Sequence, residues 1–119
     1  MTEKVFDIRK RSFEFGASII RLSTKLPKNS AGYAVCNQIV RSGTSVGANI
    51  EEAQSAGTKK EFIRGITIAL KEARETKYWL RLIAETKLAQ TKEIERLIEE
   101  NTEIIKILIT IIKKSKAKP

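Results

Sequence analysis

A row of basic residues in the middle of the sequence has the composition and spacing of a nucleic-acid contact surface. The row comprises Lys60, Arg64, Thr67, Lys71, Arg74, Tyr78 and Arg81. Its members follow one another at alternating steps of four and three, so they share one face of a helix. Lysine and arginine along such a line can contact successive phosphates, and Tyr78 among them can stack on a base. The basic row therefore predicts binding of RNA or DNA, although an ordinary solvated helix face has the same pattern.

Two further basic segments add to this prediction. Lys113 to Lys118 form a basic tail, and Arg9, Lys10 and Arg11 are consecutive near the N-terminus. Over the whole chain Lys and Arg outnumber Asp and Glu by 23 to 14, a formal net charge of +9. Such a balance suits a polyanionic partner, whether nucleic acid or a membrane surface, and it also suits a protein whose basic surface is simply solvated.

The stretch from Gln38 to Ala53 has little charge and little bulk. No ionisable side chain lies between Arg41 and Glu51. Gly43 and Gly47 are four residues apart and so share a helix face, although each costs about 1 kcal/mol of helix propensity relative to Ala. We infer that close packing offsets this cost, either inside the bundle or against another subunit.

Polar residues follow the same stretch at steps of four, four and three: Arg41, Ser45, Asn49 and Glu52. We interpret this polar line as a seam that fixes helix register, and a ligand or catalytic site is the alternative. Because an unsatisfied buried polar group costs about 1–3 kcal/mol, Asn49 and Glu52 need partners. We expect them on the next helix, around Glu72 and Glu75.

The composition argues against most kinds of catalytic site. The chain has no histidine, which removes histidine general bases and the Glu-x-x-His ligands of di-iron bundles. It has no Gly-rich phosphate loop, and the single cysteine, Cys36, falls among apolar residues where a small buried hydrophobe is the expected role. We expect a non-enzymatic protein with no catalytic residue, metal or cofactor.

The single cysteine also excludes an internal disulfide, and the first residues lack the apolar core of a signal peptide. The most apolar segment, Ile104 to Ile112, is much shorter than the roughly 20 residues that span a bilayer. We therefore expect a cytoplasmic protein without a membrane partner.

The apolar spacing predicts four helices over residues 7–25, 31–54, 59–85 and 91–114, followed by a frayed basic tail over 115–119. On the first helix Ile8, Phe15, Ile19, Leu22 and Leu26 form the core stripe, which Phe13, Ala17 and Ile20 widen. Tyr33 joins the apolar side of the second helix, and Asn101 interrupts that of the fourth as a residue that specifies register. Short breaks between helices predict one all-α domain over residues 1–119, an antiparallel up-down-up-down four-helix bundle.

Helix-capping residues mark the breaks. Asp7 is a plausible cap for the first helix, Asn29 or Ser30 for the second and Thr91 for the fourth. Gly57 is available for a left-handed helix end. Thr58 to Glu61 matches a capping box, in which Thr58 accepts from the Glu61 N–H and the Glu61 carboxylate reaches back to Thr58.

The run Gln38 to Ala53, followed by Phe62 and Ile68 to Ala73, resembles the bacterial four-helix bundle protein family. Its members are also called intervening-sequence proteins, because some are encoded within insertions in the large-subunit ribosomal RNA gene. The most specific part is Arg41-x-x-x-Ser45-Val46-x-x-Asn49-Ile50. Many members read Asn-Ile-Ala-Glu-Gly where this chain has Asn49 to Ala53, and Glu52 is kept.

The resemblance implies an antiparallel bundle that assembles into a homopentamer without established catalytic activity. The family is also similar to the accessory protein of diversity-generating retroelements, a basic pentameric barrel thought to bind nucleic acid and its reverse transcriptase. We thus expect a homo-oligomer, pentameric by resemblance, that binds RNA. A structural module that docks a partner protein without nucleic acid is the alternative.

Overall fold

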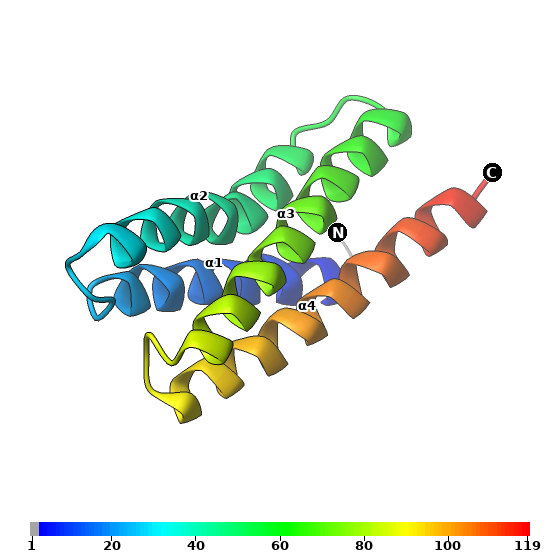
Figure 1. Ribbon diagram of the computed structural model, residues 1–119. Coiled ribbons are helices and arrows are strands. Elements are labelled where there is room, and N and C mark those ends of the chain that lie inside the picture. The colour runs from blue at the N-terminus through cyan, green and yellow to red at the C-terminus, as the bar shows by residue number, and fades with distance from the viewer. Residues whose placement is uncertain (1–2) are drawn as a thin grey trace.

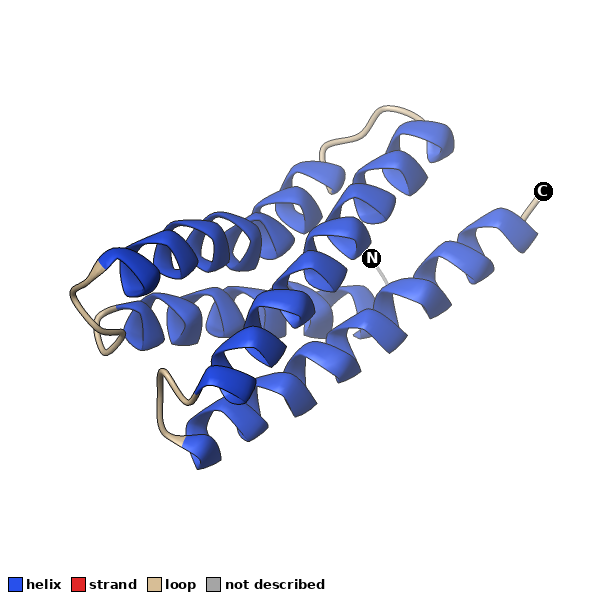
Figure 2. Ribbon diagram, viewed as in Figure 1, coloured by secondary structure: helices blue, strands red, loops and turns tan. Residues whose placement is uncertain are grey.

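The computed structural model describes residues 3–119, with side chains described from Ile8 onward. The chain forms α1 (Glu3–Ser23), α2 (Ser30–Ala53), α3 (Lys59–Thr86) and α4 (Thr91–Ala117) (Figure 1). Over these residues every connection is a short loop, and no strand is present (Figure 2). The predicted all-α four-helix bundle is confirmed.

Each helix runs antiparallel to the next, so both termini lie toward the same end of the bundle (Figure 1). α3 packs against α2 on one side and α4 on the other, and α1 packs against α2. The contact between α1 and α4 is the sparsest of the four helix contacts. The outer side of α3 is therefore left to solvent.

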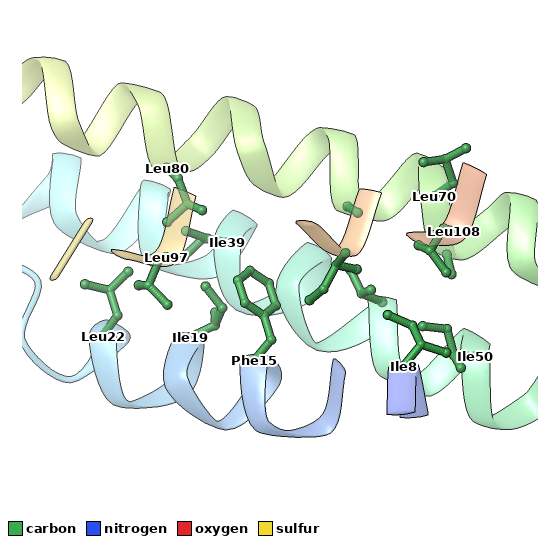
Figure 3. Packing of buried hydrophobic residues seen from close by; sticks show 14 of the residues in the cluster. Ile8, Phe15, Ile19, Leu22, Ile39, Ile50, Leu70, Leu80, Leu97 and Leu108 are labelled. Atoms are coloured by element: carbon green, nitrogen blue, oxygen red, sulfur yellow. The ribbon is translucent and has the colours of Figure 1, made fainter. Parts of the chain in front are cut away.

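The core is a continuous set of apolar side chains, mostly aliphatic, from all four helices. Figure 3 shows Phe15 pointing from α1 into the space between the helices, beside Ile19 and Ile39. Polar side chains also lie in this core: the Ser42 and Thr76 hydroxyls are 2.9 Å apart and share a hydrogen bond between α2 and α3. Asn101 is fully buried and its Nδ2 donates to the Ala73 carbonyl at 3.1 Å, which ties α4 to α3 in one register.

The predicted widening of the α1 core stripe is wrong. Phe13 is 76% exposed and Ile20 is 50% exposed, while Ala17 is half-buried. Tyr33, which was expected on the buried side of α2, is also exposed. The apolar arc of α1 is wider than its two neighbours cover, because α2 packs closely on it and α4 only sparsely.

The two strongest capping predictions are confirmed. Asn29 Oδ1 accepts from the Gly32 N–H at 2.9 Å and begins α2. Thr58 Oγ1 accepts from the Glu61 N–H at 3.1 Å and begins α3. The Glu61 carboxylate accepts from the Gly57 N–H at 3.2 Å, so the return bond of the predicted capping box is displaced by one residue.

The outer helix ends differ from the prediction. α1 begins at Glu3, so Asp7 lies inside the helix; no Gly or Pro precedes it to prevent helix. α4 continues to Ala117 and takes in much of the tail expected to fray. Lysines in its last turn interact favourably with the negative end of the helix dipole.

Two inner helix ends differ as well. Gly57 does not adopt a left-handed conformation, because α2 closes at Gln54 through right-handed backbone. The left-handed residue is Lys87, with φ of 55°, and its N–H donates to the carbonyls that end α3. Thr91 is the first residue of α4 rather than its cap.

Candidate nucleic-acid interface

The structure places the basic row on the solvent side of α3. All seven members, Lys60, Arg64, Thr67, Lys71, Arg74, Tyr78 and Arg81, are exposed. The core stripe of the same helix, which includes Ile66, Ala73 and Leu80, is fully buried. The two rows follow the same spacing with an offset of about 200°, so burial of one exposes the other.

Three of the four acidic side chains of α3, those of Glu61, Glu72 and Glu75, are engaged away from the basic row, and the fourth, Glu85, is exposed one turn after Arg81. Glu72 and Glu75 both form ion pairs with Arg41 of α2, the former at 3.4 Å between Nη1 and Oε1. The Glu61 carboxylate accepts from the Gly57 N–H beside the N-terminus of α3. Within the described part of the chain, none of the five cations of the basic row forms a salt bridge.

Tyr78 is the aromatic member of the row and is 54% exposed. Its ring contacts Trp79 edge-on, with centroids 5.0 Å apart and an interplanar angle of 78°. Trp79 Nε1 donates to Glu75 Oε2 at 3.1 Å. The tyrosine ring thus contacts a tryptophan whose own position is fixed by a hydrogen bond.

The basic tail lies near the start of the basic row. Lys59 Nζ donates to the carbonyl oxygen of Lys118, which brings the end of the chain to the first turn of α3. Lys113, Lys114 and Lys116 are exposed on the last turns of α4. The two basic segments therefore lie at the same end of the bundle.

The N-terminal basic cluster, Arg9 to Arg11, adds less free positive charge to the basic surface than its sequence indicates. Arg9 pairs with Glu51 of α2 through two hydrogen bonds of 2.9 and 3.0 Å, and Arg11 pairs with Glu100 of α4. The hydrogen bond from Arg9 holds the pKa of the Glu51 carboxyl below its ordinary value, and the same bond raises the pKa of Arg9. Arg9 and Arg11 are therefore engaged in ion pairs that join α1 to α2 and to α4.

The polar line on α2 is bonded mainly to its own helix. Ser45 Oγ donates to the Arg41 carbonyl at 2.6 Å, and Asn49 Nδ2 donates to the Ser45 carbonyl at 2.8 Å. Short polar side chains commonly bond to backbone one turn earlier. Glu52 is exposed and has no ion pair among the described residues. The partners expected on α3 for Asn49 and Glu52 are therefore wrong, and Arg41 takes Glu72 and Glu75 instead.

The glycines of α2 pack against α1 of the same chain. A Cβ at Gly43 would lie 2.9 Å from two side-chain carbons of Ile19. A Cβ at Gly47 would lie 3.2 Å from the Ser12 carbonyl oxygen. Both glycines therefore allow α2 to approach α1 closely within the bundle.

Comparison with known proteins identifies the family. The sequence profile of the family described as 23S rRNA-intervening sequence protein matches residues 4–110. The chain belongs to this family. A crystal structure of a protein of unknown function, from the S23 ribosomal protein family of Bacteroides thetaiotaomicron, is 42% identical with a TM-score of 0.87. The match covers 92% of this chain and 98% of that one. The comparison with curated proteins found no match.

This intervening-sequence family member has a second surface that the sequence did not point to. Phe13, Gly16, Ala17 and Ile20 of α1 and Gly47 and Ala48 of α2 line a shallow groove, here called the α1–α2 apolar face. Phe13, Ala17 and Ile20 are spaced by four and three residues, and this spacing was interpreted as core. Because the α2 glycines draw the two helices together, that apolar row lies outside their contact.

Over the described residues, no three His, Cys, Asp or Glu side chains come together in a group that could hold a metal ion. Cys36 is half-buried, with Sγ 3.9 Å from the Ser23 carbonyl. No helix in the same part of the chain is both long and apolar enough to cross a bilayer.

Proposed function

We propose that this member of the 23S rRNA-intervening sequence protein family is a non-enzymatic homo-oligomer, pentameric as the family resemblance implies, that binds RNA. The outer face of α3 is the contact surface. The observation that carries the proposal is the exposed basic row. Its five cations have no acidic partner among the described residues, while Glu72 and Glu75 are engaged by α2 and Glu61 by a helix cap.

The length of the basic row supports a polymer rather than a small anion. From Lys60 to Arg81 the row is roughly 30 Å long at about 1.5 Å per residue. That length allows contacts with several phosphates of one strand. The lysines at the end of α4 lie beside the first turn of α3 and lengthen the basic surface.

Neutralising the basic row tests this proposal. In the variant Lys60→Gln, Arg64→Gln, Lys71→Gln, Arg74→Gln and Arg81→Gln, affinity for RNA should fall strongly. If all five side chains contact phosphates, the slope of log K against log salt should lose about 0.7 per contact on a single strand. Fluorescence anisotropy with a labelled RNA over a range of salt concentrations measures both quantities.

The matched control removes the same amount of charge elsewhere: Arg21→Gln, Lys28→Gln, Lys87→Gln, Lys92→Gln and Arg96→Gln. These side chains are exposed, belong to no described salt bridge and lie toward the other end of the bundle. Equal losses in the two variants would mean that net charge, not the basic row, attracts RNA. If the wild type binds no RNA but captures a partner protein after nuclease treatment, the protein-docking alternative replaces the proposal.

The α1–α2 apolar face supports self-assembly. An aromatic side chain that is 76% exposed beside Ile20 and a glycine-lined groove is the pattern of a surface that a partner covers. Phe13→Glu should dissociate the oligomer and leave the helices intact, because the side chain contributes little to the monomer core. Sizing with light scattering and circular dichroism measure these two outcomes.

Gln90→Glu is the control for Phe13→Glu, since it adds the same charge in the exposed α3–α4 connection. It should leave the assembly unchanged. An oligomer that persists with Glu at position 13 would show that another surface holds the subunits together.

A further inference from the structure

The surroundings of Tyr78 point to the kind of nucleic acid that the basic row takes, an inference that rests on the proposed function. Tyr78 has Arg74 one turn before it and Arg81 one turn after it on the same exposed face. The Tyr78 side chain is 54% exposed, so about half of its surface is accessible to a ligand.

The tyrosine ring is supported from the side. Trp79 lies edge-on at 5.0 Å, its Nε1 donates to Glu75, and Glu75 pairs with Arg41 of the adjacent helix. Glu72 pairs with the same arginine. Through this chain of contacts the support for Tyr78 extends to α2, which limits the positions that the ring can adopt and favours preorganised stacking.

A base can stack on Tyr78 only if the face of the base is not already stacked on another base. Bases inside a duplex stack on one another, whereas those of a single strand can be splayed out onto aromatic side chains. Arginines one turn away on each side are placed to contact the phosphates that flank such a base. Contacts with duplex phosphates need only the cations, so the exposed aromatic ring between them favours a single-stranded ligand.

We propose that α3 binds single-stranded RNA, with an unpaired base stacked on Tyr78 and flanking phosphates on Arg74 and Arg81. Trp79, Glu75 and Arg41 act as positioning residues that hold the tyrosine ring. Duplex RNA contacts the cations alone and gains nothing from the ring.

The test compares a single-stranded RNA of about 12 nucleotides, within the site sizes of such proteins, with the same RNA annealed to its complement. Tyr78→Ala should weaken binding of the single strand by about 5- to 150-fold and leave duplex binding unchanged. Tyr78→Phe should restore single-strand affinity because it keeps the ring. Tyr33→Ala, which removes the chain's other tyrosine from an exposed site on α2, should have no effect.

Trp79 supplies a second readout, since it is the only tryptophan of the chain and contacts Tyr78 directly. Its fluorescence should change when the single strand binds and remain constant with the duplex. In Arg41→Met the fluorescence response should decrease, and single-strand affinity should fall more than duplex affinity. Some loss with both RNAs is expected, because the substitution also frees Glu72 and Glu75 beside the basic row.

The possible results separate this inference from the proposed function. If Tyr78→Ala binds both RNAs as the wild type does, or loses both equally, Tyr78 is not a base-stacking residue and the inference is overturned. In that case sensitivity to neutralisation of the basic row still supports RNA binding. If the wild type binds neither RNA, the inference and the RNA-binding proposal both fail.

Discussion

Phe15→Ala should lower the free energy of unfolding by about 3–5 kcal/mol, the range for truncating a buried phenylalanine. The side chain is 2% exposed and points into the core from α1 (Figure 3). The cost adds the lost burial of the ring to the cavity that remains, because the surrounding side chains relax only partly. Urea denaturation followed by circular dichroism measures the change.

Phe13→Ala is the matched comparison, because it makes the same substitution two residues earlier on the same helix. Phe13 is 76% exposed, and surface substitutions usually change stability by less than about 0.5 kcal/mol. If assembly buries Phe13, any cost of Phe13→Ala should vanish on dilution, whereas that of Phe15→Ala should persist. Equal costs for both variants in the dilute protein would place Phe13 in the monomer core and contradict the structure.

These two phenylalanines show where sequence patterns reach their limit. The apolar spacing of α1 identifies Ile8, Phe15, Ile19 and Leu22 correctly, because a helix buries a stripe with its own period. It cannot give the width of the stripe, which depends on how closely the neighbouring helices approach. On α1 that approach is set by Gly43 and Gly47 of α2, which lie 24 and 35 residues after the α1 residues that they face.

The basic row could be predicted from the sequence, because its exposure follows from the burial of the core stripe on the same helix. Its period is that of the core stripe of α3 with a constant offset, so burial of Ala73 and Leu80 fixes the exposure of Lys71 and Tyr78. The sequence does not predict toward which helix the acidic side chains beside the row point. Whether Glu75 faces the row or α2 depends on Arg41, and that contact joins separate helices.

Gly32→Ala should destabilise the protein by about 1–3 kcal/mol, although alanine is the better helix former by about 1 kcal/mol. A Cβ at this position would lie 1.8 Å from the Pro27 carbonyl oxygen and 2.7 Å from its carbonyl carbon. Both atoms are backbone, and the proline ring fixes its own φ, so the neighbour cannot yield as a flexible side chain would. The first turn of α2 must therefore move away from the connection that follows α1.

That movement has two consequences that add to the clash. It separates Asn29 from the Gly32 N–H, which loses a cap whose removal typically costs about 1 kcal/mol. It also displaces the connection that carries Leu26, a residue that is 5% exposed and part of the core. Thermal and urea unfolding should both report the loss.

Gly57→Ala provides the comparison of opposite sign. Gly57 is exposed, its φ is not positive, and the nearest atom to a Cβ there is the Glu61 carboxylate oxygen at 3.9 Å. With no clash, restricting the unfolded chain should stabilise the protein by about 0.4–1 kcal/mol. Opposite effects of one chemical change would show that contact, rather than helix propensity, requires glycine at position 32. A gain in stability from Gly32→Ala would instead mean that α2 and the connection at Pro27 are not packed as closely as the structure places them.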